Sequence, residues 1–165
     1  MALKFSGFTA VATTANTLIV GYDSNLNTNN RYTLAQLADG IQPSLPQSFV
    51  IACSDETTAL AAGTNKAIFR MPYAFTLTAV RASLTTAGTT SGLTTVDIHE
   101  NGTTILSTKI TIDLTEKTSV TAATQPVISD ATLADDAQIS IDLDAISGGA
   151  SETGLKVTLI GYPTP

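Results

Sequence analysis

The chain has 165 residues, of which 43% are hydrophobic, so it is long enough to bury the core of one domain. Charged residues make up only 13%, about half the usual share of a soluble domain, and the net charge is −6. The eight Lys and Arg residues are scattered singly, which argues against binding of nucleic acid. A surface with so few charges is poorly suited to a free monomer, and we expect a homo-oligomer.

Targeting signals and disulfides are not expected. No stretch approaches the roughly 18 apolar residues of a membrane span, so we expect no membrane partner. The first residues, MALKFSGF, lack the apolar stretch of a signal peptide. The single cysteine, Cys53, forms no internal disulfide and lies in the apolar run FVIAC. We expect it to be a buried, unreactive thiol.

Residues 1–41 form the first predicted unit. FTAVAT and TLIVGYD predict short strands, SNLNTNN a polar turn, and RYTLAQLADG a strand end that passes into a short helix from Thr33 to Gly40. About forty residues bury too little surface to fold alone, so this segment needs a partner and is the best candidate for an anchor. The candidate attachment residues are Leu18, Ile19, Val20, Tyr22, Tyr32, Leu34 and Leu37.

A linker is predicted over residues 42–48. The stretch IQPSLPQS contains Pro43 and Pro46, which lack amide donors and bias their predecessors to extended backbone. This composition is typical of a stiff, extended connection between two units.

Residues 49–165 read as continuous β structure. Apolar and polar residues alternate with the period of two that half-buried strands require. About seven or eight strands with regular turn signals predict an all-β fold, an antiparallel, jelly-roll-like β-sandwich. A bulge is expected near Val80, one helical turn in ETTALAAG, and a turn in LADDAQ. The expected strands lie in residues 49–54, 64–72 and 75–87, in the two arms of a hairpin around Asn101 and Gly102, and in residues 109–115, 138–146 and 155–162.

The hairpin in TVDIHENGTTILSTKITID is the strongest local signal. Asn101 and Gly102 tolerate the positive φ that both central positions of a type I′ turn need. The turn places Val96, Ile98 and Ile105 on the inner face, and Asp97 and His99 on the outer face. The expected opposite pairs are Glu100 with Thr103, His99 with Thr104, and Ile98 with Ile105.

His99 is the only histidine and lies between Asp97 and Glu100 in the sequence. A histidine among carboxylates is where a catalytic base or a metal ligand would be sought. The hairpin does not gather the three side chains at one place, so we expect a solvated outer face beside a turn. Catalysis, for example by a hydrolase, and metal binding remain alternatives, and a metal site usually needs three ligands of fitting geometry.

Other chemical signals are weak, and we expect no catalytic residues, no metal site and no cofactor. The acidic residues near the C-terminus match no calcium loop, although calcium stays an alternative for them. The chain has no phosphate-binding loop, no dinucleotide fingerprint and no nucleophile elbow. It also lacks tryptophan, which weakens sugar binding. These acidic residues are Asp130, Asp135, Asp136, Asp142 and Asp144.

Two parts of the sequence resemble a known group of proteins. TLIVGYDSNLNTNNRYTLAQL is similar to the N-terminal attachment segment of fibre and appendage proteins of tailed bacteriophages. FRMPYAFTLTAVRASLTTA and the later segments DIHENGTTILSTKITID, EKTSVTAATQPVISDATLADDAQISIDLD and GLKVTLIG resemble a β-sandwich module of phage virion proteins. The resemblance spans nearly the whole chain, and its motifs are strands and turns. It implies a non-enzymatic virion structural protein, oligomeric and often trimeric.

The place in the virion is a separate expectation. The chain carries no repeated or coiled-coil stem of the kind that a long tail fibre needs. We therefore expect a short head fibre or capsid decoration protein, made in the host cytoplasm and docked on major capsid or tail subunits at the virion surface. The alternative is a tail fibre or receptor-binding adhesin, in which loops 88–92 and 147–154 face a host glycan or another surface ligand.

Overall fold

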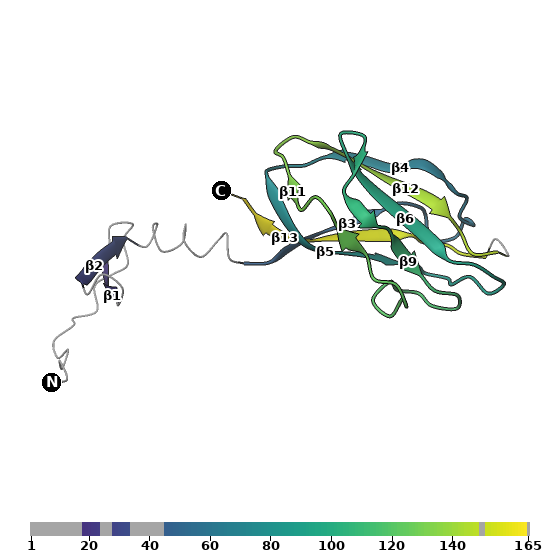
Figure 1. Cartoon of the computed structure of the whole chain (residues 1–165), viewed down its shortest axis with the longest axis horizontal. Helices are drawn as coiled ribbons and strands as arrows, with labels where there is room; N and C mark the ends of the chain where they lie inside the picture. The colour runs from purple at the N-terminus through teal and green to yellow at the C-terminus, as the bar shows by residue number, and fades with distance from the viewer. Residues whose placement is uncertain (1–17, 24–27, 34–44, 149–150, 165) are drawn as a thin grey trace. The chain divides into compact units, whose positions relative to one another are not determined.

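The computed structural model describes residues 18–23, 28–33, 45–148 and 151–164, and all regular elements among them are β-strands (Figure 1). The strands pair antiparallel throughout. The chain divides into two units, Met1–Ser44 and Leu45–Pro165. The predicted all-β, antiparallel class is confirmed.

The described part of the first unit is a hairpin. β1 (Leu18–Asp23) pairs with β2 (Thr28–Thr33), with Ile19 opposite Tyr32. The predicted polar turn SNLNTNN is too long, because its last three residues belong to β2. The predicted strand FTAVAT and the helix expected up to Gly40 lie outside the described residues.

One sheet of the second unit has four strands in the order β11-β5-β13-β3. These strands are β3 (Gln47–Ala52), β5 (Phe75–Ser83), β11 (Thr132–Leu133) and β13 (Lys156–Pro163). β3 begins inside the stretch that the sequence assigned to the linker. β3 pairs only with β13, so its other edge is open among the described strands.

The other large sheet has five strands in the order β4-β12-β6-β7, with β9 also paired to β6. They are β4 (Gly63–Arg70), β6 (Thr94–Glu100), β7 (Thr103–Thr104), β9 (Ile110–Ile112) and β12 (Gln138–Ala145). A further small sheet joins β8 (Leu106–Thr108) and β10 (Val127–Ile128).

Both large sheets contribute to one hydrophobic core, which is consistent with a β-sandwich. Most inward positions of the predicted alternation are in the core, because side chains of a strand point to opposite faces in turn. Ala79 and Leu114 were also expected inward but are only partly buried. The hairpin residues Val96, Ile98 and Ile105 are among the core residues, as predicted. Fully buried residues from β5, β12 and β13 are Phe75, Ile139, Ile141, Leu143, Val157 and Leu159.

Two local expectations need correction. ETTALAAG forms no helix, because Asp55 Oδ1 accepts hydrogen bonds from the backbone N–H groups of Thr57 and Thr58 and holds the chain in a turn. The bulge of β5 is real but lies two residues earlier than expected. Ile160 pairs with Ala79 and Gly161 with Leu77, so Thr78 is the extra residue.

Candidate functional site

A polar cluster lies on the outer face of β6 and β12. We call it the His99 cluster, and it comprises Asp97, His99, Lys109, Asp142 and Asp144. The register brings it together, since Asp142 pairs with Asp97 and the next outer position, Ser140, pairs with His99. His99 Nε2 lies 3.7 Å from Asp97 Oδ2, and His99 Nδ1 lies 3.7 Å from Asp142 Oδ2. Lys109 Nζ bridges Asp97 Oδ2 at 3.0 Å and Asp144 Oδ2 at 2.5 Å.

Asp97 corrects the expectation of a solvated outer face. It is 2% exposed, because Thr104 of β7 and Lys109, just before β9, cover it. Thr104 Oγ1 donates to Asp97 Oδ1 at 2.6 Å, and the backbone N–H of Ile98 donates to the same oxygen at 2.8 Å. The alternation in the sequence indicates on which face of the sheet a side chain lies, but it does not indicate which other segments of the chain cover that face.

The electrostatics of the cluster favour the charged forms of Asp97 and Lys109. Burial by itself raises the pKa of Asp97, but the hydrogen bonds from Thr104, Lys109 and Ile98 outweigh it and hold this pKa below its ordinary value of 3.8. The hydrogen bonds to Asp144 and then Asp97 raise the pKa of Lys109. The carboxylate and the ammonium are therefore both charged at neutral pH.

The geometry of His99 fits a structural role better than a catalytic one. Distances of 3.7 Å to both carboxylates exceed a good hydrogen bond. Asp142 Oδ1 instead accepts from the backbone N–H of Asn65 at 2.7 Å. Within the described ranges, no group of three or more His, Cys, Asp or Glu residues has a geometry that holds a metal ion.

The predicted turn is present. Asn101 has φ 48° and Gly102 has φ 85°, the positive values that a type I′ turn requires. His99 pairs with Thr104 and Glu100 with Thr103, as expected. The turn also contacts the start of β12, where the backbone N–H of Asn101 donates to Gln138 O at 2.8 Å.

The attachment residues are placed only in part. Leu18, Ile19, Val20 and Tyr22 belong to β1, and Tyr32 belongs to β2. Leu34 and Leu37 lie outside the described residues. Attachment itself stays a prediction.

The acidic residues of the C-terminal third do not form one site. Asp135 and Asp136 precede β12, whereas Asp142 and Asp144 lie in its second half. Arg70 donates to the backbone oxygen of Asp136 at 2.8 Å, which ties the turn to β4. Asp130 Oδ1 accepts from the N–H of Thr132.

The two loops considered for ligand contact lie side by side. The N–H of Gly148 donates to Ser91 O at 2.5 Å. Glu152 and Ser147 turn inward and are both 2% exposed, and Thr94 Oγ1 donates to Glu152 Oε1 at 2.5 Å. A Cβ on Gly88 would lie 1.4 Å from Ser147 Oγ, so only glycine fits there. No local pattern in the sequence indicates that a carboxylate of this loop is buried.

Cys53 lies where the sequence predicts. It is 7% exposed, and burial raises the pKa of its thiol to about 11, although a backbone hydrogen bond with Val157 lowers that pKa slightly. A thiol that is protonated at neutral pH is a poor nucleophile.

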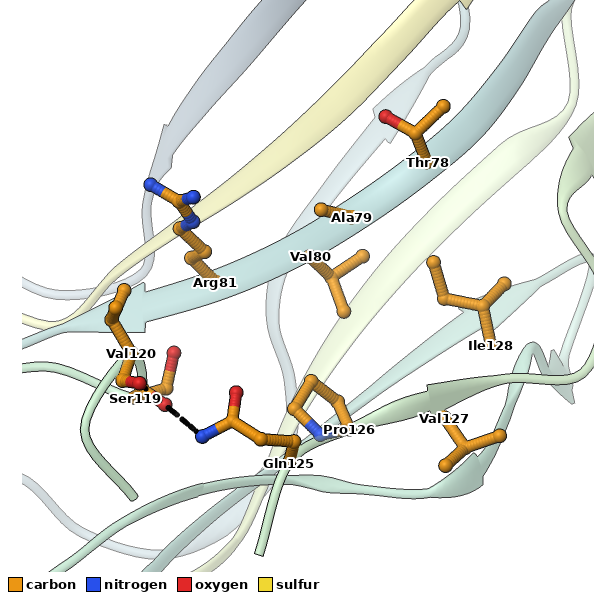
Figure 2. Close-up of a pocket in the computed structure, with 10 residues that line it drawn as sticks. All are labelled: Thr78, Ala79, Val80, Arg81, Ser119, Val120, Gln125, Pro126, Val127 and Ile128. Atoms are coloured by element: carbon orange, nitrogen blue, oxygen red, sulfur yellow. Dashed lines mark hydrogen bonds between the residues drawn. The ribbon is translucent and has the colours of Figure 1, made fainter. Parts of the chain in front are cut away.

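A groove of about 440 Å³ lies between β5 and residues 125–128 (Figure 2). Val80 points across it toward Ile128, and Arg81 stands at the rim near Val120. Gln125 Nε2 donates to the backbone oxygens of Ser119 and Ala122, which fixes one end of the groove. This groove cannot be recognised from the sequence, because its two walls, β5 and residues 125–128, are more than forty positions apart in the chain. The lining residues are Thr78, Ala79, Val80, Arg81, Ser119, Val120, Gln125, Pro126, Val127 and Ile128.

The chain was compared with family models, curated proteins and solved structures. No family model, no curated protein and no solved structure matches the chain. In the described part of the chain, no helix is long and apolar enough to cross a membrane.

Proposed function

We propose that this chain is a non-enzymatic structural protein of a tailed-bacteriophage virion, a short head fibre or capsid decoration protein. The observation that carries the proposal is the resemblance of residues 17–37 to phage attachment segments. The segment LIVGYD of that resemblance is β1, paired with β2 in a unit separate from the larger β unit. In this proposal the larger unit is a jelly-roll-like sandwich that points away from the particle.

The small size of the first unit supports an anchoring role. An isolated two-stranded hairpin is marginally stable at best in water and gains stability by packing against another surface. The candidate attachment residues in β1 and β2 are mainly apolar or aromatic. A capsid or tail subunit would supply the surface that they lack, and the protein would then lie at the virion surface after synthesis in the host cytoplasm.

The location is tested on intact particles. Virions are incubated with gold-labelled antibody raised against residues 45–165 and imaged by electron microscopy. We expect gold over the heads, and particles from a deletion of the gene serve as the control. Gold on tails alone contradicts the head assignment and favours the second candidate, whereas unlabelled virions contradict a virion role.

The second candidate is a tail fibre or adhesin that binds a host glycan. The pairing of loops 88–92 and 147–154 favours it, because loops on a rigid β scaffold commonly carry binding sites. A glycan array probed with the labelled protein tests it. Binding that is lost on substitution of Thr89 and Thr90 supports the adhesin, and a blank array at millimolar sensitivity contradicts it.

A further inference from the structure

We propose that the groove between β5 and residues 125–128 binds a short extended peptide, with an acidic residue between apolar ones, as an added strand on β5. The site is independent of the virion assignment and goes beyond it. The proposal rests on an interrupted strand edge, on the apolar walls of the groove and on Arg81, which forms no ion pair among the described residues.

The edge of β5 that faces away from β13 is identified by its hydrogen bonds. The N–H of Ser119 donates to Ala82 O at 2.9 Å, and the N–H of Leu84 donates to Lys117 O at 2.9 Å. Ala82 and Leu84 therefore direct their backbone groups away from β13. Because alternate residues of an antiparallel strand bond to the same side, Val80 directs its N–H and C=O to this edge as well.

None of the described strands lies opposite Val80 on that edge. Continuing the pairing of Ala82 with Ser119 would place Thr121 opposite Val80, but the chain turns away there, with the N–H of Ala122 donating to Ser119 O at 3.3 Å. On the other side of the gap, the N–H of Leu77 donates to Ala131 O at 2.7 Å. One rung of the ladder is therefore missing among the described residues.

The missing rung opens into the groove. Val80 is only 4% exposed, so its backbone groups are largely shielded from bulk water and gain from a partner. An extended peptide offers a donor and an acceptor at the spacing of one rung. The ladder segments at both ends limit the added strand to about three residues, at roughly 3.3 Å each.

The walls suit such a strand. β5, in one wall, is paired with β13. β10, in the opposite wall, is paired with β8, and Val127 lies opposite Thr108. Val120 and Val127 are each 51% exposed at the groove. The volume of about 440 Å³ lies in the common range of ligand sites. Apolar side chains of the peptide would cover these valines.

The positive charge of Arg81 favours an acidic residue at the centre of the bound peptide. Arg81 is the only charged residue in the lining, and in the described part of the chain no carboxylate forms an ion pair with it. Arg81 follows Val80 and points to the opposite face of β5 (Figure 2). A three-residue strand in this gap lies opposite Val80, Ala79 and Thr78. Its central residue, opposite Ala79, shares the face of Arg81 and lies diagonal to it, so a glutamate or aspartate there pairs with the guanidinium.

The test uses the full chain labelled with ¹⁵N and the capped peptide acetyl-Val-Glu-Val-amide at millimolar concentration. We expect amide shifts confined to the groove residues, with a downfield shift of the Val80 amide as its N–H gains an acceptor. The control peptide acetyl-Val-Lys-Val-amide should bind at least threefold more weakly, the size of an exposed ion pair.

Matched variants locate the effect. Arg81→Gln should weaken binding of the glutamate peptide about threefold and remove the preference over the lysine peptide. Arg70→Gln, at an exposed arginine of β4 outside the groove, should change neither the affinity for the glutamate peptide nor its preference over the lysine peptide. The proposal is overturned if no shifts appear, if they lie outside the groove, or if both peptides bind the natural protein equally.

Discussion

Asp97 is an outer-face residue that the fold has buried. Its carboxylate accepts hydrogen bonds from Thr104 and from the N–H of Ile98, and Lys109 supplies the opposite charge. Burial of a carboxylate is unfavourable unless such partners are present. Together with Thr104 of β7, the His99 cluster therefore links β6, β7 and β12.

Replacing Asp97→Asn should lower the free energy of unfolding by about 1–2 kcal/mol, because Lys109 loses a buried partner while Asp144 still compensates part of its charge. Urea denaturation at pH 7 measures this difference. An unchanged urea midpoint would contradict a stabilising role of Asp97.

The pH dependence follows from the lowered pKa of Asp97. A carboxylate whose pKa is lower in the folded state stabilises the fold above its unfolded value, near 3.8, and loses this contribution as pH falls through the folded value. The gap in stability between the natural protein and Asp97→Asn should therefore be full at pH 7 and should shrink below about pH 3.8.

The conformation of the turn at Asn101 and Gly102 can be tested at Gly102. Its φ is 85°, and a Cβ there would meet nothing within 4 Å, so a substitution is disfavoured by backbone conformation alone. Gly102→Val should lower the free energy of unfolding by about 1–3 kcal/mol, whereas Gly102→Asn should have a smaller effect because Asn tolerates this conformation. Thermal unfolding of both variants makes the comparison. Equal melting temperatures for the two variants would show that φ does not limit this position.

At the scale of elements, β3 is poorly protected along one edge. Its sequence QSFVIA has no charged residue, Val50 is 64% exposed, and its outer edge is open among the described strands. Natural proteins usually protect such edges with charges or cover them. Together with the low charge of the chain, this edge favours self-association.

We therefore expect an oligomer that Val50→Lys weakens. A trimer of the 17.0 kDa chain would weigh about 51 kDa, measured by light scattering of the purified protein. Val50→Lys should shift the mass toward that of the monomer, because it places a charge in the interface. Thr90→Lys, in an exposed loop, is the control and should leave the mass unchanged. A natural protein that is already monomeric contradicts the expectation.

The long strands were predictable and the short ones were not. β5, β6, β12 and β13 have seven to nine residues; β5 and β12 lie within predicted segments, and β6 and β13 each extend one residue beyond theirs. β7, β10 and β11 have two residues each, too few for a period to appear. Such strands form because the neighbouring chain offers an edge to pair with.

At the scale of the whole molecule, the core belongs to the second unit. The core cluster described extends from Cys53 to Leu159, and its members come from both large sheets. The unit Leu45–Pro165 therefore has what it needs to fold without the first unit.

Deleting residues 1–44 should leave a soluble protein with a β-type circular dichroism spectrum and a cooperative thermal transition close to that of the full chain. If the first unit is the anchor, the truncated protein should no longer join particles in an infected culture that lacks the full-length protein. Incorporation at the normal level would move the docking surface to the second unit.

The sequence by itself determined the class of the fold, the inward face of each long strand and the turn at Asn101 and Gly102. These features depend on local properties, namely the period of two along a strand and the positive φ that Asn and Gly tolerate. Only the tertiary structure decided which outer-face residues are covered and where the edge of β5 is left open. Asp97, Glu152 and the groove at Val80 depend on contacts between segments that lie far apart in the chain, and no local pattern in the sequence specifies which segments meet.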